Sequence, residues 1–223
     1  MNGQVTELAN TVLATARTMN ASGINRGSAG NVSARCEDGF IITPTGMAYD
    51  ACDAEDMVVV GLDGKLLKVG DGDTASKQRK PSSEWRFHRD IYTARPEAGA
   101  VVHTHSAFAT ALACMQMSVP AFHYMVARFG GVDVRCATYA TFGGQELSDS
   151  IIIALDQRCA CLMAHHGMVV FGRDCDHALA LAVELETLCE QFWRVLQLGR
   201  PKLLAGDEMT RVLARFASYG QQE

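Results

Sequence analysis

Two short segments of this chain concentrate histidines that could bind a metal. His103 and His105 stand two positions apart, directly after the apolar run GAVV, and the segment AHHGM places His165 beside His166. Residues i and i+2 of a strand point to the same face of a sheet, so His103 and His105 can reach one ion. Three imidazoles with one exchangeable position are typical of a catalytic zinc site. The clustering favours such a site, and spacing leaves His165 and His166 equal as the third ligand.

Glu84 is a carboxylate that can complete this chemistry. It follows Ser82 and Ser83 at the expected start of a helix. An acidic residue there is common for a simpler reason, because it interacts favourably with the helix dipole by about 0.3–1 kcal/mol. Beside a metal ion with an open position, the same carboxylate can both bind the ion and move a proton. The dipole explains an isolated Glu, and the nearby histidines make the metal role a specific hypothesis.

Three segments have the composition of anion-binding turns. They are GSAGNVS at 27–33, TPTGM at 43–47 and PSSE at 81–84. Amides without an obstructing Cβ, hydroxyls and a helix start all stabilise a phosphate group. Ordinary turn chemistry is the simpler explanation for each segment taken alone. The chain has no GxxxxGK[ST] motif, which argues against a nucleotide-binding P-loop.

The composition is that of a globular protein. The chain has 223 residues, 48% of them hydrophobic, and a formal net charge of -5. No basic stripe indicates a nucleic-acid partner, no apolar run is long enough to span a membrane, and the first residues lack the pattern of a signal peptide. The eight cysteines are scattered without a CxxC pair, which indicates reduced thiols. We expect one domain over residues 1–223 in a cytoplasmic protein.

Hydrophobic periodicity and turn residues predict alternating helices and strands around these segments. A helix over 4–22 precedes a Gly-rich loop at 23–35 that enters a strand, a strand at 40–46, and a hairpin at 57–67. A helix over 81–96 would carry Pro81 in its first turn and Ser82 or Ser83 as its cap. The remaining expected elements are a strand at 99–106, a buried helix at 107–116, a strand and loop at 135–147, a helix at 148–157, a hairpin at 159–172, and helices at 177–199 and around 208–216. This alternation predicts an α/β layered protein with a mostly antiparallel or mixed sheet.

Several of these segments together carry a resemblance to a known family. GNVSAR, ITPTGM, PSSEWRFH, VVHTHS, HYM, YATFGGQEL and HHGM occur in this order. They resemble the class II aldolase/adducin family, and within it the L-fuculose-1-phosphate aldolases, from about residue 5 to the C-terminal SYG. The resemblance implies a three-layer α/β/α sandwich around a mostly antiparallel sheet. It also implies a homotetramer whose active sites lie between neighbouring subunits.

The resemblance also implies roles for individual residues. It makes His103, His105 and His166 the zinc ligands, which decides between the two histidines of HHG, and Glu84 the metal-binding acid/base. The cofactor would be one Zn²⁺ per subunit, with Mn²⁺ or Co²⁺ as possible replacements. Tyr124 of the adjacent subunit would protonate the aldehyde oxygen, and Tyr219 would be a mobile C-terminal tyrosine. The phosphate contacts would be Ser28, Asn31, Thr45, Gly46, Ser82 and Ser83.

The implied reaction is the reversible retro-aldol cleavage of a ketose 1-phosphate, such as L-fuculose 1-phosphate, to dihydroxyacetone phosphate and a short aldehyde. The few lysines lie in polar segments, which disfavours a Schiff-base mechanism. Three alternatives remain: an L-ribulose-5-phosphate 4-epimerase, an aldolase for 5-deoxy- or methylthio-ribulose 1-phosphate, and a non-catalytic module like the adducin head. HYM with Tyr124 favours an aldolase over the epimerase, and the intact ligand set disfavours the adducin-like module.

Two segments depart from the pattern of the family. The loop at 69–80 is longer than in similar family members and directly precedes the segment with Glu84. ARFGG replaces a run of small residues, which would put Arg128 and Phe129 near the expected subunit interface. Either departure can change the preferred aldehyde without changing the reaction.

Overall fold

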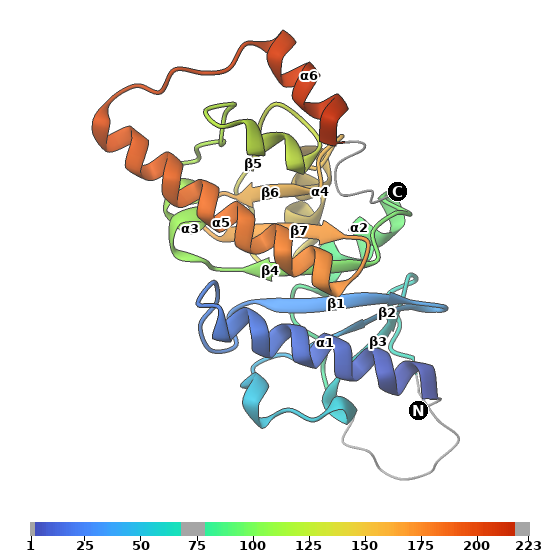
Figure 1. The fold of residues 1–223 in the computed structure, drawn as a ribbon. Helices are drawn as coiled ribbons and strands as arrows, with labels where there is room; N and C mark the ends of the chain where they lie inside the picture. The colour runs from blue at the N-terminus through green and yellow to red at the C-terminus, as the bar shows by residue number, and fades with distance from the viewer. Residues whose placement is uncertain (1–2, 68–78, 217–223) are drawn as a thin grey trace.

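A seven-stranded sheet with helices on both faces forms the centre of the fold (Figure 1). The computed structural model describes residues 3–67 and 79–216. One face of the sheet is covered by α1 (Gly3–Ala21), α3 (Ala107–Cys114) and α5 (Cys175–Leu198), whose buried residues share one apolar core. The other face is covered by α2 (Trp85–Ala94) and α4 (Gln145–Ala154), which contribute to a second core. This confirms the predicted three-layer α/β/α sandwich.

The sheet is antiparallel except at one edge. Its strand order is β3-β2-β1-β4-β7-β6-β5, and only β5 and β6 run parallel. The strands are β1 (Asn31–Cys36), β2 (Gly39–Ile42), β3 (Val58–Gly61), β4 (Ala100–Thr104), β5 (Cys136–Ala137), β6 (Ala160–Met163) and β7 (Gly167–Gly172). Alternate residues of β4 enter opposite cores: Ala100 and Val102 face α5, while Val101 faces α2 and α4. His103, two residues beyond Val101, therefore points to the side of α2.

Most of the predicted elements are confirmed, with shifted bounds. α1, α5 and α6 (Gly206–Phe216) agree closely with the expected helices, and Gly199 ends α5 as expected. α4 begins three residues earlier than predicted, at Gln145. The expected hairpin at 57–67 has only β3 as a regular strand, because Leu66 forms a single isolated bridge to Val60. The helix expected to be buried, α3, has an exposed end at Cys114.

The prediction for the start of α2 is wrong. The helix begins at Trp85, and Glu84, rather than Ser82 or Ser83, occupies the N-cap position. The preceding residues are instead extended beside residues 43–45: Pro81 forms a bridge with Pro44, and the Ser82 N–H donates to the Thr43 carbonyl. These backbone bonds outweigh the helix-start signal of the Pro-Ser-Ser sequence. As a result, two of the three expected anion-binding segments lie side by side.

All eight cysteines are free, as predicted. Within residues 3–67 and 79–216, we find no helix with both the length and the apolar character required to cross a bilayer.

Candidate metal centre

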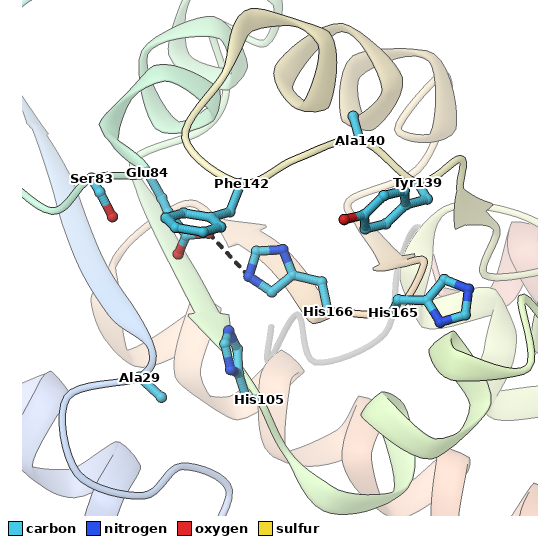
Figure 2. Close-up of a pocket in the computed structure, with 9 residues that line it drawn as sticks. All are labelled: Ala29, Ser83, Glu84, His105, Tyr139, Ala140, Phe142, His165 and His166. Atoms are coloured by element: carbon cyan, nitrogen blue, oxygen red, sulfur yellow. Dashed lines mark ion pairs between the residues drawn. The ribbon is translucent and has the colours of Figure 1, made fainter.

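Four side chains that can bind a metal converge at one end of β4. The ligand atoms of Glu84, His103, His105 and His166 all lie within 4.8 Å of one another. His103 Nε2 lies 3.0 Å from His105 Nε2 and 3.2 Å from Glu84 Oε2. His166 Nε2 lies 3.0 Å from Glu84 Oε1, as the dashed line in Figure 2 shows. The residues proposed as ligands are thus brought together from three separate segments of the sequence.

The turn between β6 and β7 selects His166 rather than His165. His165 has a left-handed backbone conformation, with φ of 55°, and its side chain lies away from the cluster, 3.2 Å from the Gln116 amide. Figure 2 shows His166 pointing toward Glu84 while His165 points in the opposite direction. Gly167 permits the approach of this turn to β4, because a Cβ at that position would lie 2.3 Å from the Thr104 carbonyl oxygen.

Hydrogen bonding prepares His103 to act as a ligand. Its Nδ1 lies 2.8 Å from the Met168 carbonyl oxygen, which only accepts, so Nδ1 carries the proton. The lone pair of Nε2 therefore faces the cluster. A backbone carbonyl that fixes the tautomer in this way is the usual outer partner of a metal-binding histidine.

The hydrogen bonding of the Glu84 carboxylate also indicates a cation site. Oε1 is buried and, apart from the approach of His166 Nε2 at 3.0 Å, has no hydrogen-bond partner among the described residues. Oε2 lies 3.2 Å from His103 Nε2. A divalent cation would give Oε1 a partner, and the donor set of three imidazoles and one carboxylate suits zinc.

The electrostatics of the cluster favour a charged Glu84 and a neutral His105. Burial alone would raise the pKa of Glu84, but His103 and His166 together lower it well below its usual range. Burial, reinforced by the neighbouring His103 and His166, lowers the pKa of His105 to about 4. These are the protonation states in which both groups bind a metal.

A pocket of about 350 Å³ opens onto the cluster (Figure 2). Ala29, Ser83, Tyr139 and Phe142 are among its lining residues, and Figure 2 shows the Phe142 ring beside Glu84 and the Tyr139 ring beyond His166. Tyr139 and Phe142 are exposed, at 62% and 67%, so their rings are available to a ligand. The pocket therefore combines a metal-binding floor, a hydroxyl-bearing wall and an aromatic wall.

The residues expected to contact phosphate occupy different environments. Ser83 lines the pocket, whereas Ser82 is buried and its hydroxyl accepts from the Glu84 N–H at 3.3 Å. The Thr45 N–H donates to the Lys80 carbonyl. Ser28, Thr45 and Gly46 are exposed. The structure thus places Ser83 in the pocket next to the cluster, and the phosphate role of all these residues stays a prediction.

Asn31, for which a phosphate contact stays a prediction, makes two buried hydrogen bonds beside the cluster. Its side chain is buried, its amide nitrogen donates to Glu84 Oε2 at 2.9 Å, and its amide oxygen lies 2.5 Å from His88 Nε2. Ser33 and Tyr92 continue this hydrogen-bonded chain. Sequence reasoning missed Ser33, His88 and Tyr92. The sequence contained a signal for them. Asn31 and Ser33 are polar residues at alternate positions of one strand, and the polar side chains of Glu84, His88 and Tyr92 recur at every fourth position of PSSEWRFHRDIY.

Tyr124 lies outside this pocket. It is 51% exposed and lines a second pocket of about 580 Å³ between the 3₁₀ helix η3 (Tyr124–Phe129) and α6. Arg128 lines the same pocket and pairs with Glu184 at 3.6 Å. Phe129 is fully buried in the core of its own chain, and its place near a subunit interface stays a prediction. Tyr219 and most of the loop at 69–80 lie outside the described residues.

Comparison with known proteins identifies relatives over nearly the whole chain. The family model described as "Class II Aldolase and Adducin N-terminal domain" matches residues 10–193. A 5-methylthioribulose-1-phosphate/5-deoxyribulose-1-phosphate aldolase of Rhodospirillum rubrum is 47% identical over 220 residues, covering 99% of this chain and 96% of the relative. An L-fuculose phosphate aldolase of Escherichia coli is 40% identical over 215 residues, covering 96% of each.

The fold is similar to solved structures of the same kind. The structure of an L-fuculose 1-phosphate aldolase superposes with a TM-score of 0.88 at 29% identity, covering 95% of this chain and 96% of the other. The likeness therefore extends over the sheet, both helical layers and the segments that carry the cluster.

Proposed function

Since the chain belongs to the class II aldolase and adducin family and is an aldolase, we propose that it cleaves a ketose 1-phosphate to dihydroxyacetone phosphate and a short aldehyde at the cluster of Glu84, His103, His105 and His166. The convergence of these four ligand atoms is the observation that carries the proposal. Zinc held there would act as a Lewis acid toward the negative charge that develops when the carbon–carbon bond breaks.

The substrate we favour is a ribulose 1-phosphate with an apolar group at C5, of the 5-deoxy or 5-methylthio type. The relative that acts on these substrates is 47% identical to the chain, against 40% for the L-fuculose phosphate aldolase. The exposed rings of Tyr139 and Phe142 offer an apolar wall to such a substituent. L-Fuculose 1-phosphate is the second candidate, because an L-fuculose 1-phosphate aldolase shares the fold.

In this proposal the chain's own residues carry the protons. Cleavage breaks the C3–C4 bond of the ketose, after the C4 hydroxyl has lost its proton to become the aldehyde oxygen. The electron pair passes toward C3, and Glu84, after taking up a proton that balances the one lost from the C4 hydroxyl, delivers it to C3 to complete dihydroxyacetone phosphate. Ser83, in the pocket beside Glu84, donates to the phosphate and holds the substrate in register.

Tyr124 has a role in this proposal only through a second subunit. Its exposed position at the start of η3, outside the metal pocket of its own chain, supports a homotetramer in which Tyr124 reaches the pocket of a neighbour. There its hydroxyl would exchange the proton of the C4 oxygen.

The proposal is tested by product analysis. The zinc-loaded enzyme is incubated with dihydroxyacetone phosphate and acetaldehyde, methylthioacetaldehyde or L-lactaldehyde, and separately with L-ribulose 5-phosphate. We expect condensation, fastest with the first two aldehydes, and no epimerised pentose phosphate. EDTA should abolish the activity and zinc should restore it. Full activity in a metal-free preparation, or epimerisation as the main reaction, would refute the proposal.

A further inference from the structure

A buried chain of hydrogen bonds links Glu84 to the interior of the protein. From the site inward it runs from Glu84 Oε2 to the Asn31 amide at 2.9 Å, then to His88 Nε2 at 2.5 Å. His88 Nδ1 lies 2.6 Å from Ser33 Oγ, which lies 2.7 Å from the Tyr92 hydroxyl. All five side chains are buried. Four of them lie behind the carboxylate and do not line the pocket.

This series of hydrogen bonds forms because α2 and β1 lie against each other and carry polar side chains at similar intervals along their axes. On α2 and its N-cap, polar residues follow one another at intervals of four: Glu84, His88 and Tyr92. On β1 the interval is two, between Asn31 and Ser33. Four helical residues rise about 6 Å and two strand residues rise about 6.7 Å. Each polar side chain of one element can therefore meet one of the other, which gives His88 a partner at both of its ring nitrogens.

The chemistry of the groups fixes the direction of every hydrogen bond. A carboxylate only accepts, so the amide nitrogen of Asn31 donates to Glu84 and its amide oxygen faces His88. That oxygen also only accepts, so His88 Nε2 carries the proton and donates. His88 Nδ1 then accepts from the Ser33 hydroxyl, and Ser33 in turn accepts from Tyr92. In every hydrogen bond of the series, the donor therefore lies on the side away from Glu84 and donates toward it.

The surroundings of His88 hold its ring between its two hydrogen-bond partners. It is fully buried, and its ring stacks on Phe87 with centroids 4.7 Å apart. Burial lowers the pKa of His88 to about 3, so the ring is neutral and keeps one donor and one acceptor. A neutral imidazole locked between a hydroxyl and an amide has a fixed tautomer.

We propose that His88 is a positioning residue for the aldolase reaction. Its Nε2–H fixes the amide of Asn31, which holds Oε2 of Glu84 and so sets the plane of the carboxylate beside the three histidines. The inference rests on the proposed function of Glu84 as metal ligand and acid/base. His88 itself touches neither the substrate nor the ligand atoms of the cluster. Groups that orient a metal ligand in this way typically change affinity or activity by about 10- to 100-fold when removed.

Two substitutions of similar size test the roles of the two ring nitrogens separately. His88→Gln keeps an N–H donor near the position of Nε2 and loses the acceptor for Ser33. His88→Asn keeps a polar group near Nδ1 and leaves the amide oxygen of Asn31 without a donor. The same pair of substitutions at His177, a histidine of α5 outside the site, controls for loss of a histidine as such. Each protein is compared as the zinc-loaded enzyme for kcat, KM and the zinc dissociation constant in chelator competition.

We expect His88→Asn to lower kcat about tenfold or more and to weaken zinc binding, with KM within about twofold of wild type. His88→Gln should restore most of both losses, and the His177 pair should change neither. Equal effects of Asn and Gln at position 88, or a change in KM alone, would overturn the proposal. A merely structural histidine would not distinguish the two amides in kcat.

Ser33→Ala keeps the inference testable if His88→Asn does not fold. Without the Ser33 hydroxyl, the His88 ring loses the hydrogen bond at Nδ1 that helps to hold its plane, so its Nε2–H is less well aimed at the Asn31 amide oxygen. We expect kcat and zinc affinity to fall, and wild-type values for both would overturn the proposal. The zinc measurement separates this inference from the proposed function. A wild-type enzyme that binds zinc but cleaves no ketose 1-phosphate would refute the function, while zinc affinity would still test His88.

Discussion

Asn31 of β1 lies directly opposite His103 of β4 in the antiparallel register, and both side chains meet the same oxygen of Glu84. Asn31 Nδ2 donates to Oε2 at 2.9 Å, and His103 Nε2 lies 3.2 Å from it. Gly30 permits this pairing, because a Cβ there would lie 2.4 Å from the His103 carbonyl oxygen. A slip of one residue would turn Asn31 to the other face of the sheet. The register of two strands thus places the carboxylate.

This relationship leads to a test of the role of Asn31. Replacing Asn31 with Ala removes the donor to Glu84 Oε2, and we expect kcat for cleavage to fall about 10- to 100-fold. Steady-state kinetics, with inorganic phosphate as a competitive inhibitor, give the measurement. If Asn31 holds Glu84, the inhibition constant of phosphate should stay within about twofold of wild type. If Asn31 contacts the substrate phosphate instead, that constant should rise and kcat should be less affected.

The two adjacent histidines of HHG should differ in their effect on metal content. His166→Ala removes a nitrogen that lies 3.0 Å from Glu84 Oε1, and we expect zinc affinity to fall by at least about 100-fold. His165→Ala is the matched control, because that side chain lies outside the cluster near Gln116. Zinc content after dialysis against a weak chelator distinguishes them. Equal zinc loss from both variants would contradict the arrangement of the turn.

An intersubunit site can be tested by mixing two inactive variants. Glu84→Gln should remove the acid/base, and Tyr124→Phe the hydroxyl that we expect a neighbouring subunit to supply. If both residues act in one site but come from different chains, unfolding and refolding the two variants together should restore about a quarter of the sites. The activity of the refolded mixture is compared with that of each variant refolded alone. No recovery, in mixtures shown to contain both chains, would place Tyr124 outside the neighbour's site.

The residues of the cluster could be predicted because their signals are local or carried by a motif. The i, i+2 spacing paired His103 with His105, and the resemblance to the family selected His166 and added Glu84. The start of α2 was predicted wrongly because the local Pro-Ser-Ser signal was outweighed by backbone bonds to residues 43–45, which are distant in sequence. Local propensity contains no information about such partners.

The chain of hydrogen bonds behind Glu84 was missed for a similar reason. The sequence predicts Asn31 as a phosphate contact and His88 only as part of a helix, and it assigns Ser33 no role of its own. Only the packing of β1 against α2 shows that these side chains satisfy one another. Polar groups buried in an apolar layer need such partners, so their alternation along β1 was the available clue.

Glu186 of α5 should stabilise the segment that follows His105. Its carboxylate accepts from the Ser106 hydroxyl at 2.7 Å and from the N–H groups of Phe108 and Ala109 at 2.8 and 2.9 Å. It therefore caps α3 from another helix, and we expect Glu186→Ala to lower the free energy of unfolding by about 2 kcal/mol. Glu184→Ala, which removes only the partly exposed pair with Arg128, should cost less than about 1 kcal/mol. Urea unfolding compares them, and equal losses would contradict the cap.

The buried His88 should also make stability depend on pH. Burial lowers its pKa from 6.5 to about 3 in the folded protein, so the unfolded chain takes up a proton at a higher pH than the folded one. Its stabilising contribution is therefore complete above pH 6.5 and is lost as the pH falls from 6.5 toward 3. In that range the loss approaches about 1.4 kcal/mol per pH unit.

The comparison of wild type with His88→Gln isolates this contribution, because the other titrating groups are common to both proteins. Urea unfolding is measured in EDTA at pH 7 and pH 5, so that metal release does not contribute. From pH 7 to pH 5 the wild type should lose about 2 kcal/mol more than the variant. Equal losses would mean that His88 is protonated in the folded protein. His88 Nδ1 would then carry a proton and donate to Ser33, which reverses that hydrogen bond while leaving the donor to Asn31 in place.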